Sequence, residues 1–337
     1  METSQRQEDL LNGLKKANAY THSAYRITVI ETHISWILLT GKIAYKIKKP
    51  VKFGHVLDFS NLRLRKKFCQ KEFTLNKQLC GRMYLGVVKI IKIDNTYKLV
   101  NLDKMGTSLE FAVKMREIPQ KFRMDNLLVF NKINNRILNG LIGKLVRFHN
   151  LAYTNITISK HGSPQAMKAK IRENFRTLSR FAKIDSSFED KLNLFVKNNY
   201  KLFDERRKRF RIRDIHGDLY LKNIFFMKGK FYLYDRIEFN DSLRYGDIAE
   251  DVPHLAMDIH YHKREGMQLY FISNYINKSN DTSIINIIYF MMCYKACVRA
   301  KVSLFRAGQL VNRNQKSKYT KEAKEHFKLA RKYMKMF

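Results

Sequence analysis

Two carboxylates and an amide occur at a spacing that suits phosphoryl transfer. The segment that begins at His216 reads HGDLYLKN, so Asn223 follows Asp218 by five positions. A short apolar run further on ends at Asp235. In sites with this spacing the first Asp orients the attacking hydroxyl, and the Asn and the second Asp hold Mg²⁺ on the phosphates. The pattern therefore predicts Asp218 as the catalytic residue and Asn223 and Asp235 as metal ligands.

The residue types agree with that chemistry. A phosphoryl group in transfer carries dispersed negative charge, so catalysis depends mainly on positioning and charge neutralisation. A carboxylate such as that of Asp218 can accept the proton of the attacking hydroxyl. Mg²⁺ is a hard cation that prefers oxygen ligands, which Asn and Asp side chains supply. The reaction class is thus better specified than the substrate.

A predicted hairpin connects the two metal ligands. Residues 224–227 and 231–234 are strand-like, and Lys228-Gly229-Lys230 between them is a turn with Gly in the middle. Neighbouring strands lie about 5 Å apart, so Asn223 and Asp235 at the open ends could share one ion. The tripeptide HGD alone could occur by chance in a loop, but the Asn, the hairpin and the final Asp are further matches that favour a functional site.

These motifs resemble those of a known family. Residues 214–258 are similar to the catalytic segment of aminoglycoside phosphotransferases and choline kinases, a branch of the protein-kinase-like fold. The stretches ETHISWILLTG (31–41) and YKIKKPV (45–51) resemble an uncharacterised bacterial and archaeal group of aminoglycoside phosphotransferase family enzymes. The similarity covers most of the chain in patches. It implies an α+β fold with a small antiparallel-sheet lobe, one main helix in that lobe, a larger helical lobe, and the use of ATP and Mg²⁺.

The resemblance also assigns supporting residues around the catalytic loop. In this branch an Asp after the metal loop starts a helix and braces the catalytic loop. The stretch LRYGDIAED (243–251) matches that element, so Asp247 is expected to have this structural role. His216 is expected to pack and to hydrogen-bond the backbone, and not to act as a base.

A kinase-like lobe further needs a strand Lys that holds the α- and β-phosphates. Strand-like runs at 34–40 and 43–47 flank Gly41-Lys42, which is a hairpin signal. Alternation places Lys46 and Lys48 on the same face of the second strand. Both remain candidates, and Lys46 is preferred because it lies deeper in the strand. The alternative is that both are solvated strand lysines.

The phosphate-binding Lys needs a helix Glu as its partner. Residues 61–80 are predicted to form a helix with Ser60 as the N-cap. Glu72 shares an apolar face of this helix with Phe68 and Leu75. Because a buried carboxylate without a cation is costly, we predict that Glu72 pairs with the strand Lys. A Glu at the edge of the stripe that faces water is the alternative.

One feature departs from other kinase-like sites. The first hairpin carries no G-x-G-x-x-G, only Gly41 at its turn, so phosphate contacts are expected from the backbone and from Thr40. The choice between ATP and GTP stays open for the same reason. The sequence also lacks G-x-x-x-x-G-K-[ST], which argues against a P-loop kinase.

Length and composition allow two packed units. The chain has 337 residues and a hydrophobic fraction of 45%. Residues 111–115 form a predicted strand, and Pro119 marks a break after it. In kinase-like folds this is the hinge that meets the adenine, so Met115 and Ile118 are expected to contact the nucleotide. We predict a nucleotide-binding lobe over 1–118 and a lobe with the catalytic loop and acceptor-binding helices over 119–337. Helical patterns in the second lobe cover 121–151, 165–182, 186–203, 246–261, 264–277, 284–308 and 317–335.

The chain is strongly basic. It has 65 Lys and Arg against 30 Asp and Glu, a formal net charge of +35. Such an excess suggests attraction to polyanions. The densest run is 206–213, directly before the catalytic loop, and 63–67 is another. Because cations are scattered through every segment and no known RNA-binding motif accompanies them, we favour a compositional origin over a nucleic-acid surface.

The charge also bears on the acceptor. Aminoglycosides are polycations and would need an acidic pocket, whereas a basic run precedes Asp218. We therefore expect a neutral or anionic small-molecule acceptor, such as a sugar, a sugar phosphate or a nucleoside. A protein Ser/Thr kinase is disfavoured, because no A-P-E-like element follows Asp235. A basic nucleic-acid-binding protein on a kinase-like scaffold is the non-enzyme alternative.

A cytoplasmic location without membrane attachment is expected. The amino-terminal segment is polar and acidic, unlike a secretory signal. The apolar run 284–293 is too short to cross a bilayer. The sequence specifies neither the identity of the acceptor nor the oligomeric state.

Overall fold

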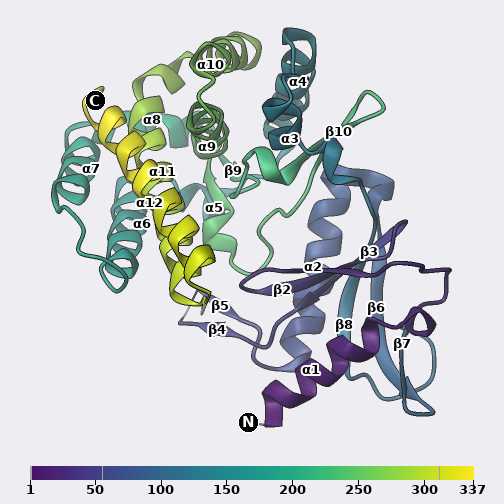
Figure 1. Ribbon diagram of the computed structural model, residues 1–337. Coiled ribbons are helices and arrows are strands. Elements are labelled where there is room, and N and C mark those ends of the chain that lie inside the picture. Colours follow the sequence, from purple (N-terminus) through teal and green to yellow (C-terminus); the bar gives the residue numbers. More distant parts are fainter. Residues whose placement is uncertain (1, 55, 311) are drawn as a thin grey trace. The chain divides into compact units, whose positions relative to one another are not determined.

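The computed structural model describes residues 2–54, 56–310 and 312–337 (Figure 1). The chain forms two compact units. Unit 1 comprises Met1–Phe122 and Tyr232–Asn240, and unit 2 comprises Arg123–Phe231 and Asp241–Phe337. The first boundary therefore follows residue 122, where the sequence predicted one after residue 118. The short segment Tyr232–Asn240, which contains Asp235, belongs to unit 1 although it lies far along the sequence.

Within the described residues, unit 1 is built on a six-stranded antiparallel sheet with the order β1-β2-β3-β8-β6-β7. The strands are β1 (Thr28–Glu31), β2 (Ser35–Leu39), β3 (Ile43–Lys48), β6 (Tyr84–Ile93), β7 (Thr96–Asn101) and β8 (Glu110–Arg116). A separate short pair consists of β4 (Lys52–Phe53) and β5 (Leu57–Asp58). The hairpin of β2 and β3 turns at Gly41, whose φ of 91° favours glycine.

The helices of unit 1 pack on this sheet. They are α1 (Glu2–Leu14) and α2 (Leu62–Cys80), with 3₁₀ turns at Ala17–Ala19, Gly81–Met83 and Gln120–Phe122. Helix α2 packs on β6 and β8, and α1 packs on β7. Tyr45 and Ile47 of β3 enter a hydrophobic core with Leu14 of α1. The intervening Lys46 and Lys48 reach the Glu72 carboxylate of α2, as strand alternation predicts.

The start of α2 corrects one prediction. The N-cap is Asn61, whose side chain accepts a hydrogen bond from the Leu64 backbone N–H at 2.9 Å. Ser60, which the sequence suggested for this position, instead donates its hydroxyl to Asp58. Ser and Asn are both good caps, so composition alone could not separate two adjacent candidates.

Unit 2 is mostly helical. Its helices are α3 (Met124–Val129), α4 (Asn135–Leu151), α5 (Ile156–Lys160), α6 (Pro164–Leu178), α7 (Ser187–Asn198), α8 (Tyr200–Lys208), α9 (Ile248–Tyr261), α10 (Glu265–Ser279), α11 (Ile288–Gly308) and α12 (Arg313–Met334). It has 3₁₀ turns at Leu221–Asn223, Asp241–Leu243 and Thr282–Asn286. Helix α9 forms its centre, because every residue from Ile248 to His260 is buried. It packs on α10, α11 and α12.

Two short strand pairs lie next to the catalytic loop. β9 (Ile212–Asp214) pairs with β12 (Tyr245–Asp247), and β10 (Ile224–Met227) pairs with β11 (Lys230–Leu233). The second pair is the predicted hairpin, but its turn has two residues instead of three. Lys228 and Gly229 both have positive φ, 50° and 73°. Such a two-residue turn matches the right-handed twist of the paired strands.

The predicted helical segments are present, with two of them divided. Residues 121–151 contain α3 and α4, and Asn134 caps α4 through a bond from Ile137 N–H. Residues 186–203 overlap α7 and α8. The α+β class and the helical character of the carboxy-terminal part are thus confirmed. No helix in the described part of the chain is long and apolar enough to cross a membrane.

Candidate active site

Two lysines of β3 share one buried carboxylate in unit 1. The ammonium nitrogen of Lys46 lies 3.0 Å from Oε1 of Glu72. Lys48 donates to the other oxygen, Oε2, at 2.7 Å. Glu72 itself is fully buried on α2. The structure therefore brings together the helix Glu and both strand lysines that the sequence singled out.

The second partners of the two lysines differ. Lys46 also donates to Asp235, whose side chain is 49% exposed. Lys48 donates to Glu238, whose side chain is only 4% exposed. The Lys48 ammonium group lies 4.8 Å from the centroid of the Phe59 ring. Lys46 thus adjoins the accessible carboxylate, whereas Lys48 belongs to the interior.

The carboxylates keep both lysines charged. Burial opposes the charge of Lys46, but Asp235 and Glu72 outweigh it and hold the pKa of Lys46 well above its usual range. Burial also opposes the charge of Lys48, and Glu238 and Glu72 raise its pKa above the ordinary value. Burial raises the pKa of Glu238, an effect that Lys48 partly offsets. With all groups ionised, two lysines face three carboxylates, and this excess of one negative charge suits an added cation.

The segment that carries Asp235 is anchored to α2. The Arg236 backbone N–H donates to the Asn76 side chain at 2.9 Å, and the Cys80 thiol contacts the Leu233 carbonyl at 3.1 Å. Asp235 itself has a φ of 65°, an unusual conformation for a residue other than glycine. Strained backbone of this kind persists where its surroundings hold it in place. Because α2 also carries Glu72, one helix positions both carboxylates that contact Lys46.

In unit 2, Asp251 of α9 holds the backbone of the predicted catalytic loop. Its two oxygens accept hydrogen bonds from the N–H groups of His216 at 2.8 Å and Gly217 at 2.9 Å. The His149 ring lies 3.3 Å from the same carboxylate. Burial disfavours the charge of Asp251, but the bonds from His149 and the loop hold its pKa well below the usual range. The bracing contact expected of Asp247 is therefore made by Asp251, one helical turn later.

Asp247 stabilises the start of α9 instead. It is the N-cap of that helix and accepts a hydrogen bond from the Ala249 N–H at 2.8 Å. Its carboxylate also binds two nitrogens of Arg206, at 2.6 and 2.7 Å. Arg206 is buried and binds Asp281 as well. Asp247 is thus structural, as expected, but it acts through the helix start and an internal ion pair.

A second carboxylate of α9 holds the loop further along. Asp258 accepts a hydrogen bond from the Leu221 N–H at 2.8 Å. Asp251 and Asp258 lie seven residues apart, and therefore on one side of the helix. The sequence did not indicate that either residue contacts the loop. The sequence shows only that Asp251 and Asp258 share one face of a helix that follows the HGD motif. Helical periodicity does not tell which part of the protein that acidic face contacts.

The predicted catalytic residues lie on the loop that α9 holds. Asn223 is buried, and its amide nitrogen donates to the Asp218 carbonyl at 3.0 Å. This orientation leaves the amide oxygen as the atom of Asn223 suited to a metal ion. The Asp218 side chain is 36% exposed, so its carboxylate is accessible to a substrate.

A histidine and an arginine lie close to Asp218. The Nδ1 atom of His254 is 4.0 Å from the Asp218 carboxylate, and its ring stacks on Tyr220. Neither ring nitrogen of His254 has a hydrogen-bond partner in the described part of the chain. Burial, aided by Lys295 and Arg299, holds the pKa of His254 well below its usual range, so the ring is neutral. The Arg299 guanidinium lies 4.3 Å from the Tyr220 ring centroid.

The remaining predicted nucleotide contacts lie in unit 1. Met115 and Ile118 are both buried, at the end of β8 and just after it. The Thr40 hydroxyl donates to the Ile43 carbonyl at 2.7 Å and lies 2.9 Å from the His22 ring. Thr40 is therefore engaged inside its own hairpin, which does not favour the phosphate contact expected of it.

Comparison with known proteins finds one group of sequence relatives. No family model matches the chain. The uncharacterised protein Rv2004c of Mycobacterium tuberculosis is 33% identical over 289 residues, and an uncharacterised Mycobacterium bovis protein matches equally well. The alignment covers 84% of this chain and 56% of each relative. The chain thus spans about half the length of the curated relatives it matches.

Solved structures show the same fold. The GDP complex of aminoglycoside 2'-phosphotransferase-IIIa has a TM-score of 0.52 and 15% identity, over 91% of this chain and 94% of that one. A choline kinase from Cryptosporidium parvum has a TM-score of 0.52 and 12% identity, over 92% and 89%. The resemblance seen in the motifs is confirmed at the level of the fold. The chain therefore has the protein-kinase-like fold that aminoglycoside phosphotransferases and choline kinases share.

Proposed function

We propose that this chain is a nucleotide-dependent phosphotransferase that moves a γ-phosphate to the hydroxyl of a small molecule. The main supporting observation is the cluster of Lys46, Glu72 and Asp235, in which a buried Lys–Glu pair adjoins an accessible carboxylate. A structural ion pair would not need the exposed Asp235. The HGD loop in unit 2 supplies the other groups that this reaction requires.

The residues of unit 1 have nucleotide-side roles in this proposal. Lys46 binds the phosphates, and Glu72 orients Lys46. Asp235 is a Mg²⁺ ligand in this proposal, in agreement with its oxygen donors and with the excess negative charge around Lys46. Asn223 of unit 2 is the other proposed Mg²⁺ ligand, through its amide oxygen. When bound, the ion neutralises charge on the phosphates. Lys48, bound by buried Glu72 and Glu238, has a structural role.

Asp218 has the acceptor-side role. Its exposed carboxylate orients the attacking hydroxyl and accepts its proton. Asp251 and Asp258 hold the loop backbone on both sides of Asp218, which fixes the direction of this carboxylate. Positioning of this kind accounts for much of the rate enhancement in phosphoryl transfer.

The surroundings of Asp218 support a neutral or anionic acceptor. The neighbouring charges include the cation Arg299, and the His254 ring, 4.0 Å from the Asp218 carboxylate, is neutral. The two carboxylates of α9 nearby are buried and bound to loop N–H groups, so they do not present an acidic surface. A polycationic aminoglycoside would need exposed carboxylates there.

The deciding experiment is Mg²⁺-dependent transfer of label from γ-labelled nucleotide to a metabolite extract. ATP and GTP are compared, because a solved structure with this fold contains GDP. Wild type is compared with Asp218→Asn and Asp235→Asn, and Asp190→Asn on the exposed side of α7 is the matched control. We expect a labelled small molecule from wild type and control, and a loss of about 10²–10⁴-fold in Asp218→Asn.

Other outcomes lead to different conclusions. Label on protein would favour the protein kinase alternative. Absence of both transfer and nucleotide binding in the well-folded wild type would refute the proposal. Rapid labelling of kanamycin, with a kcat of about 1–100 s⁻¹, would leave the phosphotransferase proposal in place and overturn the proposed acceptor class.

A further inference from the structure

Each of the two basic runs that stand out in the sequence contains an arginine that is used inside the fold. Arg206 is buried between Asp247 and Asp281. In the run 63–67, Arg65 is buried against Glu110 at 2.8 Å. Sequence density of cations is therefore a poor guide to where the basic surface lies.

Helix α12 carries the clearest exposed concentration of positive charge in unit 2. Nine of its cationic side chains, counting one just past its end, are exposed: Arg313, Lys316, Lys318, Lys321, Lys324, Lys328, Arg331, Lys332 and Lys335. At 3.6 residues per turn, all of these except Lys318 fall within an arc of about 160°. The two acidic residues of the helix, Glu322 and Glu325, fall outside this arc. We call this surface the α12 basic face.

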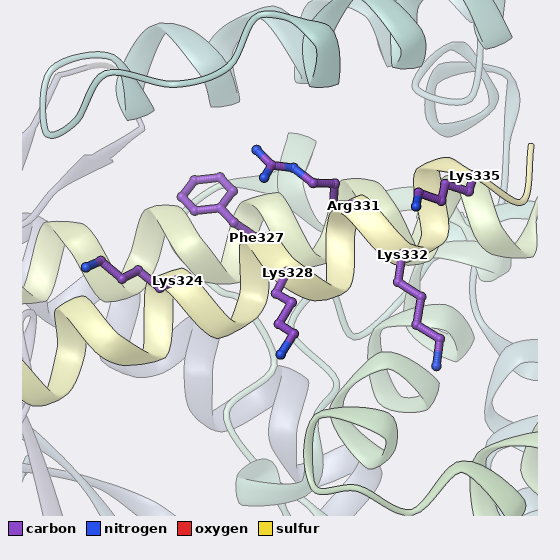
Figure 2. Close-up of a pocket in the computed structure, with 6 residues that line it drawn as sticks. All are labelled: Lys324, Phe327, Lys328, Arg331, Lys332 and Lys335. Atoms are coloured by element: carbon purple, nitrogen blue, oxygen red, sulfur yellow. The ribbon is translucent and has the colours of Figure 1, made fainter.

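The α12 basic face is hollowed along its length. One hollow is lined by Lys324, Phe327, Lys328, Arg331, Lys332 and Lys335, which Figure 2 shows projecting from this helix. A second is lined by Arg313, Lys316, Ser317, Thr320, Lys321 and Lys324. Lys324 lines both, so the two hollows lie next to each other along the helix.

Few of these cations are neutralised within the protein. Arg331 pairs with Asp185 at 3.2 Å, and Lys332 pairs with Glu265 at 2.8 Å. In residues 2–54, 56–310 and 312–337, no carboxylate forms an ion pair with the other six cations of the face. Like charges three or four residues apart on a helix repel one another, so a bound anion would relieve that repulsion.

We propose that the α12 basic face binds the phosphodiester backbone of a nucleic acid. From Arg313 to Lys335 the helix rises about 33 Å, at ~1.5 Å per residue. One nucleic-acid strand carries a phosphate about every 3.4 Å along the axis, so about ten phosphates match this length. A linear array of cations fits a linear polyanion, whereas a single phosphate compound would use only one or two of them.

The structure argues against a lipid surface as the partner. Interfacial helices bury an apolar face in the membrane. The apolar face of α12, which includes Leu329, Ala330 and Tyr333, is already buried within unit 2, where α12 packs on α11. Phe327, the aromatic residue on the basic face, is partly buried and packs on Phe188. Only the charged face is available, and its one aromatic residue, Phe327, is partly buried.

Binding of this kind is independent of base sequence, because cations contact phosphates and not base edges. It also does not depend on the proposed phosphotransfer. The residues of the α12 basic face are separate from Asp218 and Asn223, so a catalytically inactive Asp218→Asn variant retains the affinity.

The test is fluorescence anisotropy of the full chain with a labelled 20-base-pair DNA duplex and a 20-nucleotide RNA at several salt concentrations. The first variant carries Lys321→Gln, Lys324→Gln, Lys328→Gln and Lys335→Gln together. The matched control removes the same charge elsewhere in unit 2, through the exposed residues Lys132, Lys160, Lys230 and Lys278, each changed to Gln. Circular dichroism melts verify that both variants are folded.

We expect wild type and control to bind duplex with a dissociation constant of about 1–100 μM near physiological salt, as is common for sequence-independent binding. Six phosphate contacts give a slope of log affinity against log salt of about −5. Removing four cations from the face reduces that slope by about 3 to 4 and weakens binding at least about tenfold.

Three results would overturn the proposal. Equal weakening in both variants would mean that net charge, and not this face, attracts nucleic acid. If wild type at about 1 mM bound neither the duplex nor the RNA, nucleic acid would be excluded as the partner. Retention of wild type on phosphatidylserine vesicles without nucleic-acid binding would indicate a lipid surface instead.

Discussion

The ammonium group of Lys46 lies 3.0 Å from one oxygen of the Glu72 carboxylate. The other oxygen is bound by Lys48, so a single buried Glu serves two lysines of the same strand. Their remaining partners separate their roles, because Lys46 contacts accessible Asp235 and Lys48 contacts buried Glu238. The sequence only favoured Lys46 over Lys48 as the phosphate-binding residue. Because their partners differ, we expect mutation of each lysine to have a different effect on the protein.

Lys46→Met should remove activity without unfolding the protein. Glu72 keeps Lys48 as a partner, and Asp235 is half exposed and can be solvated. Loss of a phosphate-binding cation is expected to lower kcat/KM by about 10²–10³-fold. The measurement is labelled phosphate transfer together with guanidinium unfolding. A variant with normal activity would contradict the assignment of Lys46.

Lys48→Met should mainly destabilise unit 1. Glu238 would remain buried without its cation, a situation that typically costs about 3–5 kcal/mol. Chemical unfolding followed by fluorescence measures this loss, and the variant that remains folded should still bind nucleotide. If Lys48→Met were as stable as wild type but inactive, Lys48 and not Lys46 would be the phosphate ligand.

Asp251→Asn should loosen the catalytic loop. The carboxylate accepts the N–H groups of His216 and Gly217 on separate oxygens, and an amide can accept on only one atom. We expect faster amide hydrogen exchange at these two positions and a kcat lowered by about 10–100-fold, since misplacement of a reacting group is costly. Affinity for nucleotide should change little. Unchanged exchange at both amides would show that other contacts hold the loop.

Stability should fall as the pH drops from 7.5 to 5.5. Burial lowers the pKa of His326 to about 4, and it lowers that of His254 well below the ordinary value. The unfolded chain takes up protons on these rings near pH 6.5 while the folded chain does not. The stability contributed by the neutral rings is therefore complete above pH 6.5 and is lost below it, by about 1.4 kcal/mol per ring and pH unit.

Guanidinium unfolding at both pH values measures this effect. His326→Asn keeps a donor for the Glu322 carbonyl, which the Nδ1 atom of His326 contacts at 2.7 Å, and removes the titrating ring. The variant should lose less stability than wild type over the same pH interval. An identical pH dependence in both proteins would exclude His326 as a contributor.

The sequence predicted the elements of the candidate site because their signals are local. The offsets from Asp218 to Asn223 and Asp235, the hairpin between them, and the apolar stripe around Glu72 all depend on residues near one another in the chain. Lys46 and Lys48 could not be separated in this way. Their difference comes from Glu238, a contact between residues 190 positions apart.

Contacts of long range and burial of charge account for the other differences. Asp251 makes the bracing contact expected of Asp247 because it lies one turn into the helix that Asp247 caps, on the side that meets the loop backbone. Arg206 belongs to the densest basic run of the sequence, yet it is buried between two Asp residues. A net charge gives the excess of cationic over anionic side chains, but it does not tell which of them are exposed to solvent.

Because Tyr232–Asn240 belongs to unit 1, this unit cannot be completed early in protein synthesis. During synthesis, residues 1–122 leave the ribosome more than a hundred residues before Asp235 and Glu238. At about 5–20 residues per second, that gap lasts on the order of ten seconds. Until residues 232–240 are synthesised, Glu72 is the one available partner among the three carboxylates that bind Lys46 and Lys48, so residues 1–122 complete their interior only late in synthesis.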